Sequence, residues 1–385
     1  MFLALYFMAY AFKEDKTKKA ALFGLLAGIS TAIMGLFWGG VTFMFVAVAL
    51  TFFILFLLNE IKKKDIAAYS AWVIGFTAFF AFSGGRYSLI GLLTSITTAF
   101  SYFVFALLIF DYVLFKTKFS EKIKIIKLPD RMLSLILLVI IAFIFLIIIS
   151  PSFISHAAED ISNYLFKPFA TSRWITTVAE NNRPFFDAWK SSFGLTFFWI
   201  MILGSVILFY EMAGKIKLKE RVIFTGAYLL MILGIIFSRY SGSSIMNGSS
   251  TISLIFFIGS MIIFAGVSLL IYLKKDAELE FNKNIVLMTV IFFFSVFSAR
   301  SAIRLFYFIY PIAPIMASFA IIRISEIALK NKDDLLRVIL LAAALFVIGT
   351  SLYSAYGIRT AFPYSLVITK DSPVSTLPKR LSKSF

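Results

Sequence analysis

The chain has 385 residues, of which 61% are hydrophobic, whereas soluble domains average roughly 45–50% apolar residues. Its net charge of +17 would suit a nucleic-acid-binding protein, but the lysines gather in short loops between long apolar runs. We therefore attribute the charge to membrane topology and expect no nucleic-acid partner. The sequence has no cysteine, which excludes disulfides and thiolate chemistry, and its single histidine, His156, excludes a multi-histidine metal site.

Long uncharged runs dominate the chain, and 133–149 and 252–273 are examples. Runs of this length cross a hydrocarbon layer of roughly 30 Å as helices. Every backbone polar group in lipid must pair internally, and a continuous apolar run does so only as a helix. We therefore predict an all-α polytopic membrane protein with about twelve transmembrane segments. They lie near 1–12, 20–37, 41–58, 66–84, 88–115, 133–150, 193–212, 222–238, 252–273, 285–299, 304–323 and 336–355.

The distribution of basic residues predicts which loops share a side of the membrane. Most lysines and arginines fall in alternate connections, namely 13–19, 59–65, 116–131, 215–221, 274–284 and 325–337. The positive-inside rule places these connections in the cytoplasm, where they would also attract anionic membrane lipids. A transmembrane domain at 1–355 in the cell membrane would then have a long external loop at 151–192. The tail at 356–385 would also be external and is too short to form a soluble C-terminal domain.

The long external loop contains a carboxylate in a polar setting. Its aromatic residues predict order rather than disorder, with short interfacial helices at 158–165 and 185–193. Within it, Thr177, Val178, Ala179 and Glu180 form one four-residue stretch. Glu180 is either a solvated loop residue or one oxygen ligand of a hard cation. A divalent ion needs several oxygen ligands at once, so Glu180 cannot hold it alone.

Arginines near the ends of the apolar segments have either a structural or a binding interpretation. Arg300 and Arg304 stand at the outer end of two apolar segments, where they either snorkel to headgroups or bind phosphate. Arg86 and Arg239 are interpreted as structural.

The acidic residues Asp111 and Glu211 either pair with Lys116 and Lys215 or carry protons in a transporter. The outer stretch Asn247-Gly248-Ser249 is a turn or a glycosylation acceptor. Ala27-Gly28 and Trp38-Gly39-Gly40 predict close helix packing.

Three blocks, taken in order, resemble the catalytic subunit of oligosaccharyltransferase, above all its archaeal, dolichol-dependent form. The first runs from Ala27-Gly28-Ile29 to Trp38-Gly39-Gly40 and resembles a helix hairpin of that family. The second, Thr177 to Glu180, is similar to the TIxE or SVSE motif of the family's long external loop. The third, Ser298–Leu305, resembles a helix entry that carries an arginine near the lipid pyrophosphate.

The resemblance implies a fold, a reaction and a set of roles. The fold is a C-type glycosyltransferase bundle with one long external loop. The reaction moves an oligosaccharide from a lipid-(pyro)phosphate carrier to the asparagine of an N-x-S/T acceptor polypeptide. Glu180 would help to ligate Mn²⁺ or Mg²⁺ and hold the acceptor loop, while Arg304 and Arg300 would contact the lipid phosphate. The metal would offset the charge that develops on the departing phosphate.

The sequence also departs from this family. The family's essential aspartates lie in two external loops that would precede residue 1, and its WWDYG block and soluble domain have no counterpart here. The segments at 193–238 form one hairpin more than the usual form. We therefore expect a fragment or a split subunit that is inactive alone, and we assign no catalytic residue. The alternatives are another lipid-sugar transferase, such as a mannosyl- or arabinosyltransferase, a transporter, or a non-catalytic scaffold subunit.

Overall fold

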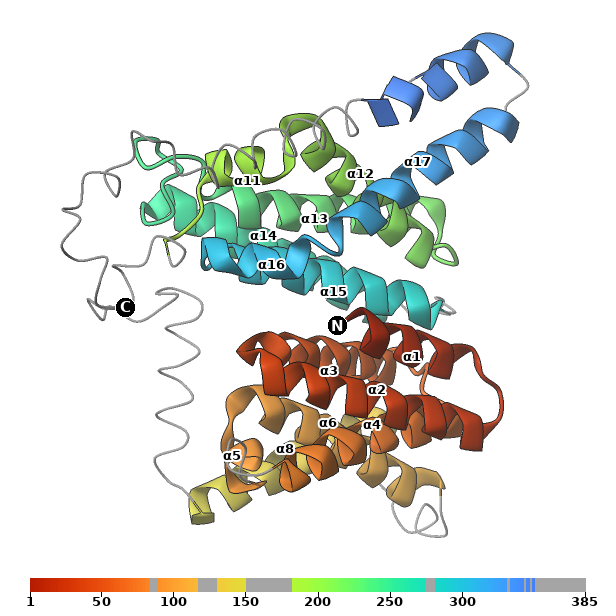
Figure 1. Ribbon diagram of the computed structural model, residues 1–385, viewed down its shortest axis with the longest axis vertical. Coiled ribbons are helices and arrows are strands. Elements are labelled where there is room, and N and C mark those ends of the chain that lie inside the picture. Colours follow the sequence, from red (N-terminus) through yellow and green to blue (C-terminus); the bar gives the residue numbers. More distant parts are fainter. Residues whose placement is uncertain are drawn as a thin grey trace, which may run out of the picture. The chain divides into compact units, whose positions relative to one another are not determined.

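The computed structural model describes residues 1–83, 89–116, 130–149, 182–273, 281–330 and 333–349, with 343 and 347 excepted. Every named regular element in these ranges is helical (Figure 1). The chain divides into two compact units. The first comprises Met1–Ala188 and Ser205–Ile315, and the second comprises Trp189–Gly204 and Met316–Phe385.

The helices follow one another with short connections. In the first unit they are α1 (Phe2–Lys13), α2 (Thr17–Phe37), η1 (Gly39–Val41), α3 (Thr42–Leu57), α4 (Lys63–Phe82), α5 (Leu89–Thr94), α6 (Ile96–Lys116), α8 (Asp130–Ile149), α13 (Leu218–Phe237), α14 (Thr251–Leu273), α15 (Lys283–Ala299), η3 (Ile303–Leu305) and α16 (Phe306–Ile309). The boundary between the units passes through α11 (Phe186–Phe193), α12 (Leu195–Met212) and α17 (Ala313–Lys330). Helix α11 matches the short helix predicted at 185–193.

Seven helical stretches in the described part are long and apolar enough to cross a membrane. They are Thr17–Phe37, Gly39–Leu57, Lys63–Phe82, Thr98–Phe115, Leu195–Met212, Leu218–Phe237 and Thr251–Leu273. Shorter apolar helices at Phe2–Lys13, Arg131–Ile144 and Lys283–Ala299 overlap three further predicted segments. These findings confirm an α-helical membrane protein, but they do not confirm twelve spans. The loop residues 151–181 and the tail 356–385 lie outside the described part.

Two predicted segments are broken in the structure. The segment at 88–115 is divided at Ser95 into α5 and α6, and the Thr98 hydroxyl donates to the carbonyl of Leu92 across the break. The segment at 304–323 is bent by 46° between Ile309 and Ala313. Pro311 lies in this bend, and proline interrupts a helix because it lacks an N–H and its ring clashes with the preceding turn.

Helices α2 and α4 pack with their backbones in close approach. A Cβ atom added to Gly28 would lie 2.4 Å from the carbonyl oxygen of Trp72, and one added to Gly24 would lie 2.1 Å from that of Ala68. Only glycine permits this spacing, and small residues allow such approach between membrane helices. The Trp72 indole N–H donates to Thr31 Oγ1 at 3.1 Å across the same interface. The predicted packing role of Ala27-Gly28 is confirmed.

Within the first unit, helix α15 contacts both early and late helices of the chain. It packs against α1 and α3 as well as against α13 and α16. Its first turn is fixed by Asp65, which is fully buried and pairs with the Lys283 ammonium group. Asp65 also accepts from the Lys62 backbone N–H at 2.8 Å and so caps α4. With 17 residues, α15 separates this end of the unit from Arg300 by about 25 Å.

Candidate functional site

Three chain segments meet where α13 and α15 end. Arg239 follows Ser238, the C-cap of α13, and Arg300 is the C-cap of α15. The third segment runs from Asn182 to the first residue of α11. There the Asn182 carbonyl accepts from the Ile303 N–H at 3.0 Å, and the Phe186 N–H donates to the carbonyls of Arg239 and Tyr240, each at 3.1 Å. These backbone contacts bring Arg183, Arg239 and Arg300 together, and we call these residues the arginine cluster.

The connection between α13 and α14 folds over the Arg239 side chain. The Tyr240 N–H donates to the Met246 carbonyl at 2.7 Å, and Arg239 and Asn247 form an isolated antiparallel bridge. Gly248 has φ +85°, and a Cβ there would lie 2.6 Å from Arg239 Cγ. Glycine is therefore required at 248 both for its left-handed backbone conformation and for the space that Arg239 takes.

The same connection shows that Asn247-Gly248-Ser249 forms a turn, the first of the two interpretations given above. The Asn247 side-chain oxygen accepts from the Ser249 N–H at 3.0 Å and the Ser250 N–H at 2.8 Å. This is an Asx turn, in which a side-chain oxygen takes the place of a backbone acceptor. The turn interpretation is confirmed, and glycosylation of Asn247 stays a prediction.

Two members of the arginine cluster are buried. Arg239 is 3% exposed and Arg300 is 5% exposed. Arg239 Nη1 donates to the Arg300 carbonyl, and Arg300 Nε and Nη2 donate to Ser238 Oγ at 3.4 and 3.3 Å. The Arg300 guanidinium also lies 3.8 Å from the centre of the Phe257 ring. Neutral partners and one aromatic face thus hold both guanidinium groups in place.

The buried charge of the cluster has no acidic partner among the described residues, since no described carboxylate forms an ion pair with Arg239 or Arg300. Burial, reinforced by the positive charges of Arg300 and Arg183, lowers the pKa of Arg239 to about 8. Burial and Arg183 lower the pKa of Arg300 to about 10. An unpaired buried charge is costly, so such a group is typical of a site that takes an anion.

The other candidate residues are spread more widely. Arg304 lies in η3 on the same connection as Arg300, but it is exposed, whereas Arg300 is buried. Asp111 is buried and accepts from the Ser134 hydroxyl at 2.7 Å. Trp38 packs on Phe308 with ring centres 4.9 Å apart, but its Gly-Gly stretch does not show the predicted close helix packing, because a Cβ at Gly39 would have no atom within 4 Å and one at Gly40 would meet the Trp38 ring. Arg86 and the stretch Thr177, Val178, Ala179 and Glu180 lie outside the described residues.

Sequence reasoning missed Arg239 and Arg183 as members of a site. Arg239 was interpreted as structural because nothing in its local sequence links it to Arg300, 61 positions away. One signal was present: Arg239 and Arg300 both follow apolar helices at the ends opposite the lysine-rich connections. Arginines that depart from the positive-inside pattern are candidates for binding.

A metal site is not built from the described residues. In the ranges given above, no group of three or more histidine, cysteine or acidic side chains could hold a metal ion. Glu180 lies outside these ranges, so the Mn²⁺ or Mg²⁺ site that the family resemblance implies stays a prediction.

We predict that anion binding at the cluster depends on pH through Arg239. Sulfate is a suitable probe, because its charge is constant between pH 7 and 9. A protonated Arg239 binds the anion, so affinity should fall as the pH rises through about 8, by about tenfold between pH 7 and pH 9. Calorimetric titration of the purified chain would measure it. Equal affinity at both pH values would exclude Arg239, and Arg239→Gln should abolish the dependence.

Comparisons with known proteins give no further identification, since neither a protein-family model nor a curated protein matches this chain.

Proposed function

We propose that this chain is the transmembrane core of an oligosaccharyltransferase and that the arginine cluster binds the phosphate or pyrophosphate of its lipid-linked oligosaccharide. One observation supports this most directly. Arg239 and Arg300 are buried together, without an acidic partner among the described residues, at the end of two apolar helices. A lipid-linked phosphate reaches a protein at this depth, where an apolar helix meets the membrane surface.

The chemistry of guanidinium suits this ligand. Its planar set of N–H donors matches the geometry of phosphate oxygens. Arg300 keeps one face against Phe257 and its Nε and Nη2 near Ser238, so its orientation is fixed before a ligand arrives. Fixed donors aimed at a leaving phosphate would stabilise the negative charge that grows as the sugar–oxygen bond breaks.

The remaining parts of the proposal rest on the sequence. The acceptor would be an asparagine in an N-x-S/T polypeptide, and the stretch ending at Glu180 would hold it. The arginine cluster would face the outside of the cell membrane and the lysine-rich loops the cytoplasm, as the positive-inside rule predicts. The chain, which is expected to be inactive alone, would act with a partner subunit that supplies acidic residues.

A second transferase from the same broad class would use the same cluster. A mannosyl- or arabinosyltransferase also releases a lipid phosphate, so the arginines alone do not select between them. Membranes that contain the chain together with its partner subunit can be given a lipid-linked oligosaccharide or a lipid-linked monosaccharide, with an N-x-T peptide as acceptor. Transfer from the oligosaccharide to the peptide supports the proposal, whereas use of the monosaccharide alone supports the second transferase.

We predict that Glu180→Gln lowers transfer to the peptide by well over tenfold in these membranes. The change removes the charge but keeps the shape, so a loss would point to the carboxylate itself. Glu159→Gln in the same predicted loop is the matched control and should keep activity within about twofold. Unchanged transfer by Glu180→Gln would leave Glu180 as a solvated loop residue. Retained transfer together with co-purification of a separate catalytic subunit would support a scaffold.

A further inference from the structure

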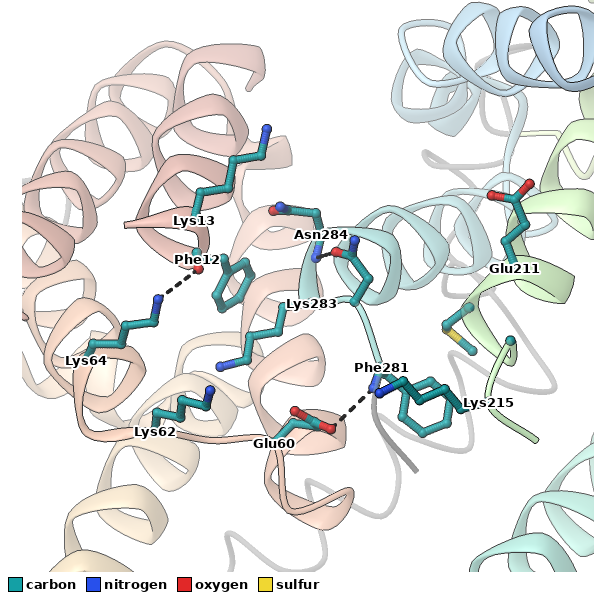
Figure 2. Close-up of a pocket in the computed structure, with 13 residues that line it drawn as sticks. Phe12, Lys13, Glu60, Lys62, Lys64, Glu211, Lys215, Phe281, Lys283 and Asn284 are labelled. Carbon is teal, nitrogen blue, oxygen red and sulfur yellow. Dashed lines mark hydrogen bonds between the residues drawn. The ribbon is translucent and has the colours of Figure 1, made fainter. Parts of the chain in front are cut away.

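A second charged site lies at the opposite end of α15, about 25 Å from the arginine cluster. It is a cavity of about 600 Å³ where α4 and α15 begin (Figure 2). We call it the lysine pocket, because its lining includes Lys13, Lys62, Lys64, Lys215 and Lys283. Four connections of the first unit, far apart in sequence, supply these lysines.

Two of the lysines hold the walls of the pocket. Lys283 pairs with the fully buried Asp65. Lys64 donates to the carbonyl of Glu14 at 2.6 Å and to Asp15 Oδ1 at 3.2 Å, so it joins the end of α1 to the start of α4. These contacts make the pocket a built feature of the fold rather than a chance gathering of surface side chains.

The five lysines of the lining exceed the four carboxylates near them by one. Glu60 and Glu211 line the cavity, while Asp15 and Asp65 pair with Lys64 and Lys283. Glu60 accepts from the Phe281 N–H at 3.2 Å and so fastens the segment that precedes α15. Lys13 and Lys62 are exposed, and neither is ion-paired within the described part of the chain.

One helix N-terminus adds to the positive potential. Asn282, the N-cap of α15, lines the pocket, whereas the start of α4 is already capped by the Asp65 carboxylate. Backbone N–H groups at a helix start carry partial positive charge and favour anions. Lysine ammonium groups beside them provide the full charges that a phosphate needs.

We propose that the lysine pocket binds the phosphate of an anionic lipid headgroup from the adjoining leaflet. The pocket lies at the ends of membrane-spanning helices, where headgroups are present at high local concentration. Basic pockets between transmembrane helices bind phosphate-bearing headgroups in this way. The cavity is also far larger than a single phosphate, as a glycerol-bearing headgroup requires. The proposal is independent of the function proposed for the arginine cluster.

The experiment measures the binding of lipid at the pocket itself, with a fluorescent label in its lining. The chain has no cysteine, so Met212→Cys, in the pocket lining, can carry a single environment-sensitive fluorophore. The labelled chain in neutral detergent is titrated with dioctanoyl phosphatidylglycerol, with dioctanoyl phosphatidylcholine and with inorganic phosphate. We expect a saturable response to phosphatidylglycerol that is at least tenfold tighter than the response to phosphatidylcholine.

Matched lysine pairs separate the pocket from general surface charge. Lys13→Gln with Lys62→Gln should weaken phosphatidylglycerol binding about 10- to 30-fold. Lys18→Gln with Lys63→Gln removes two exposed neighbouring lysines outside the lining, and should keep affinity within about twofold. Lys13→Arg with Lys62→Arg keeps both positive charges and should retain affinity.

Three outcomes would overturn the proposal. Equal weakening by both glutamine pairs would mean that the lipid responds to surface charge alone. An equal response to phosphatidylcholine would mean that acyl chains, not the phosphate, are recognised. Saturation by inorganic phosphate without a response to phosphatidylglycerol would assign the pocket to a soluble phosphate rather than a lipid.

Discussion

Replacing Arg300 with glutamine is expected to weaken binding of a lipid diphosphate by about 30-fold, because a hydrogen bond to a charged group contributes roughly 1.5–3 kcal/mol. Arg300 is the best-oriented member of the arginine cluster, held by Ser238 and the Phe257 ring. Farnesyl diphosphate is a convenient soluble probe, and its affinity for the purified chain can be measured by calorimetry. Arg239→Gln should have an effect of similar size.

The matched control for Arg300 lies on the other end of α13. Arg221 donates to the Tyr210 carbonyl at 2.7 Å and stacks 3.5 Å from the Tyr210 ring centre, so it is held in a similar way. Arg221→Gln removes the same charge and should change farnesyl diphosphate affinity by less than about twofold. Equal losses in Arg221→Gln and Arg300→Gln would contradict a local site. Without ligand, Arg300→Gln should not lower the melting temperature, because it removes a buried charge that has no acidic partner in the described part of the chain.

Replacing Gly28 with alanine is expected to lower the free energy of unfolding by about 3 kcal/mol, the upper part of the range for overpacking a well-packed interface. The added Cβ would lie 2.4 Å from the Trp72 carbonyl oxygen, which belongs to the rigid backbone of α4. The two helices would have to separate, and the hydrogen bond between Trp72 and Thr31 would be strained. Thermal unfolding in detergent, followed by circular dichroism, measures the loss.

Gly226 is the matched control for Gly28. It lies within α13, is exposed, and has no atom within 4 Å of the position that a Cβ would take. Gly226→Ala should therefore raise stability slightly, because alanine favours a helix over glycine by about 1 kcal/mol. If Gly28→Ala were as stable as Gly226→Ala, the close packing of α2 on α4 would be wrong.

Much of the helical architecture could be predicted from hydropathy. The helices α2, α3, α4, α12, α13 and α14 fall where long apolar runs predicted them, since membrane helices follow from backbone pairing in lipid and little else. The bend at Pro311 was missed because the apolar run continues through it, although the proline itself was visible. A count of twelve segments required every apolar run to be one straight span.

The candidate site could be predicted only in part. Arg300 stands out in the sequence because it follows an apolar helix at the end opposite the lysine-rich connections. Its partner Arg239 is brought to it by the packing of α13 and α15 and by the turn at Gly248, which no local pattern encodes. The lysine pocket was missed for the same reason, since its walls come from four separate connections.

The central claim is that Arg239 and Arg300 hold a lipid phosphate directly. Solid-state NMR on the chain in lipid, with ¹⁵N-labelled arginine and a bound polyprenyl diphosphate, can measure the dipolar coupling between guanidinium nitrogen and phosphorus. The account predicts strong coupling that is lost when Arg239 and Arg300 are both replaced by lysine, which carries no arginine label. Coupling that persists in this double variant, or no coupling in the unaltered chain, would contradict it.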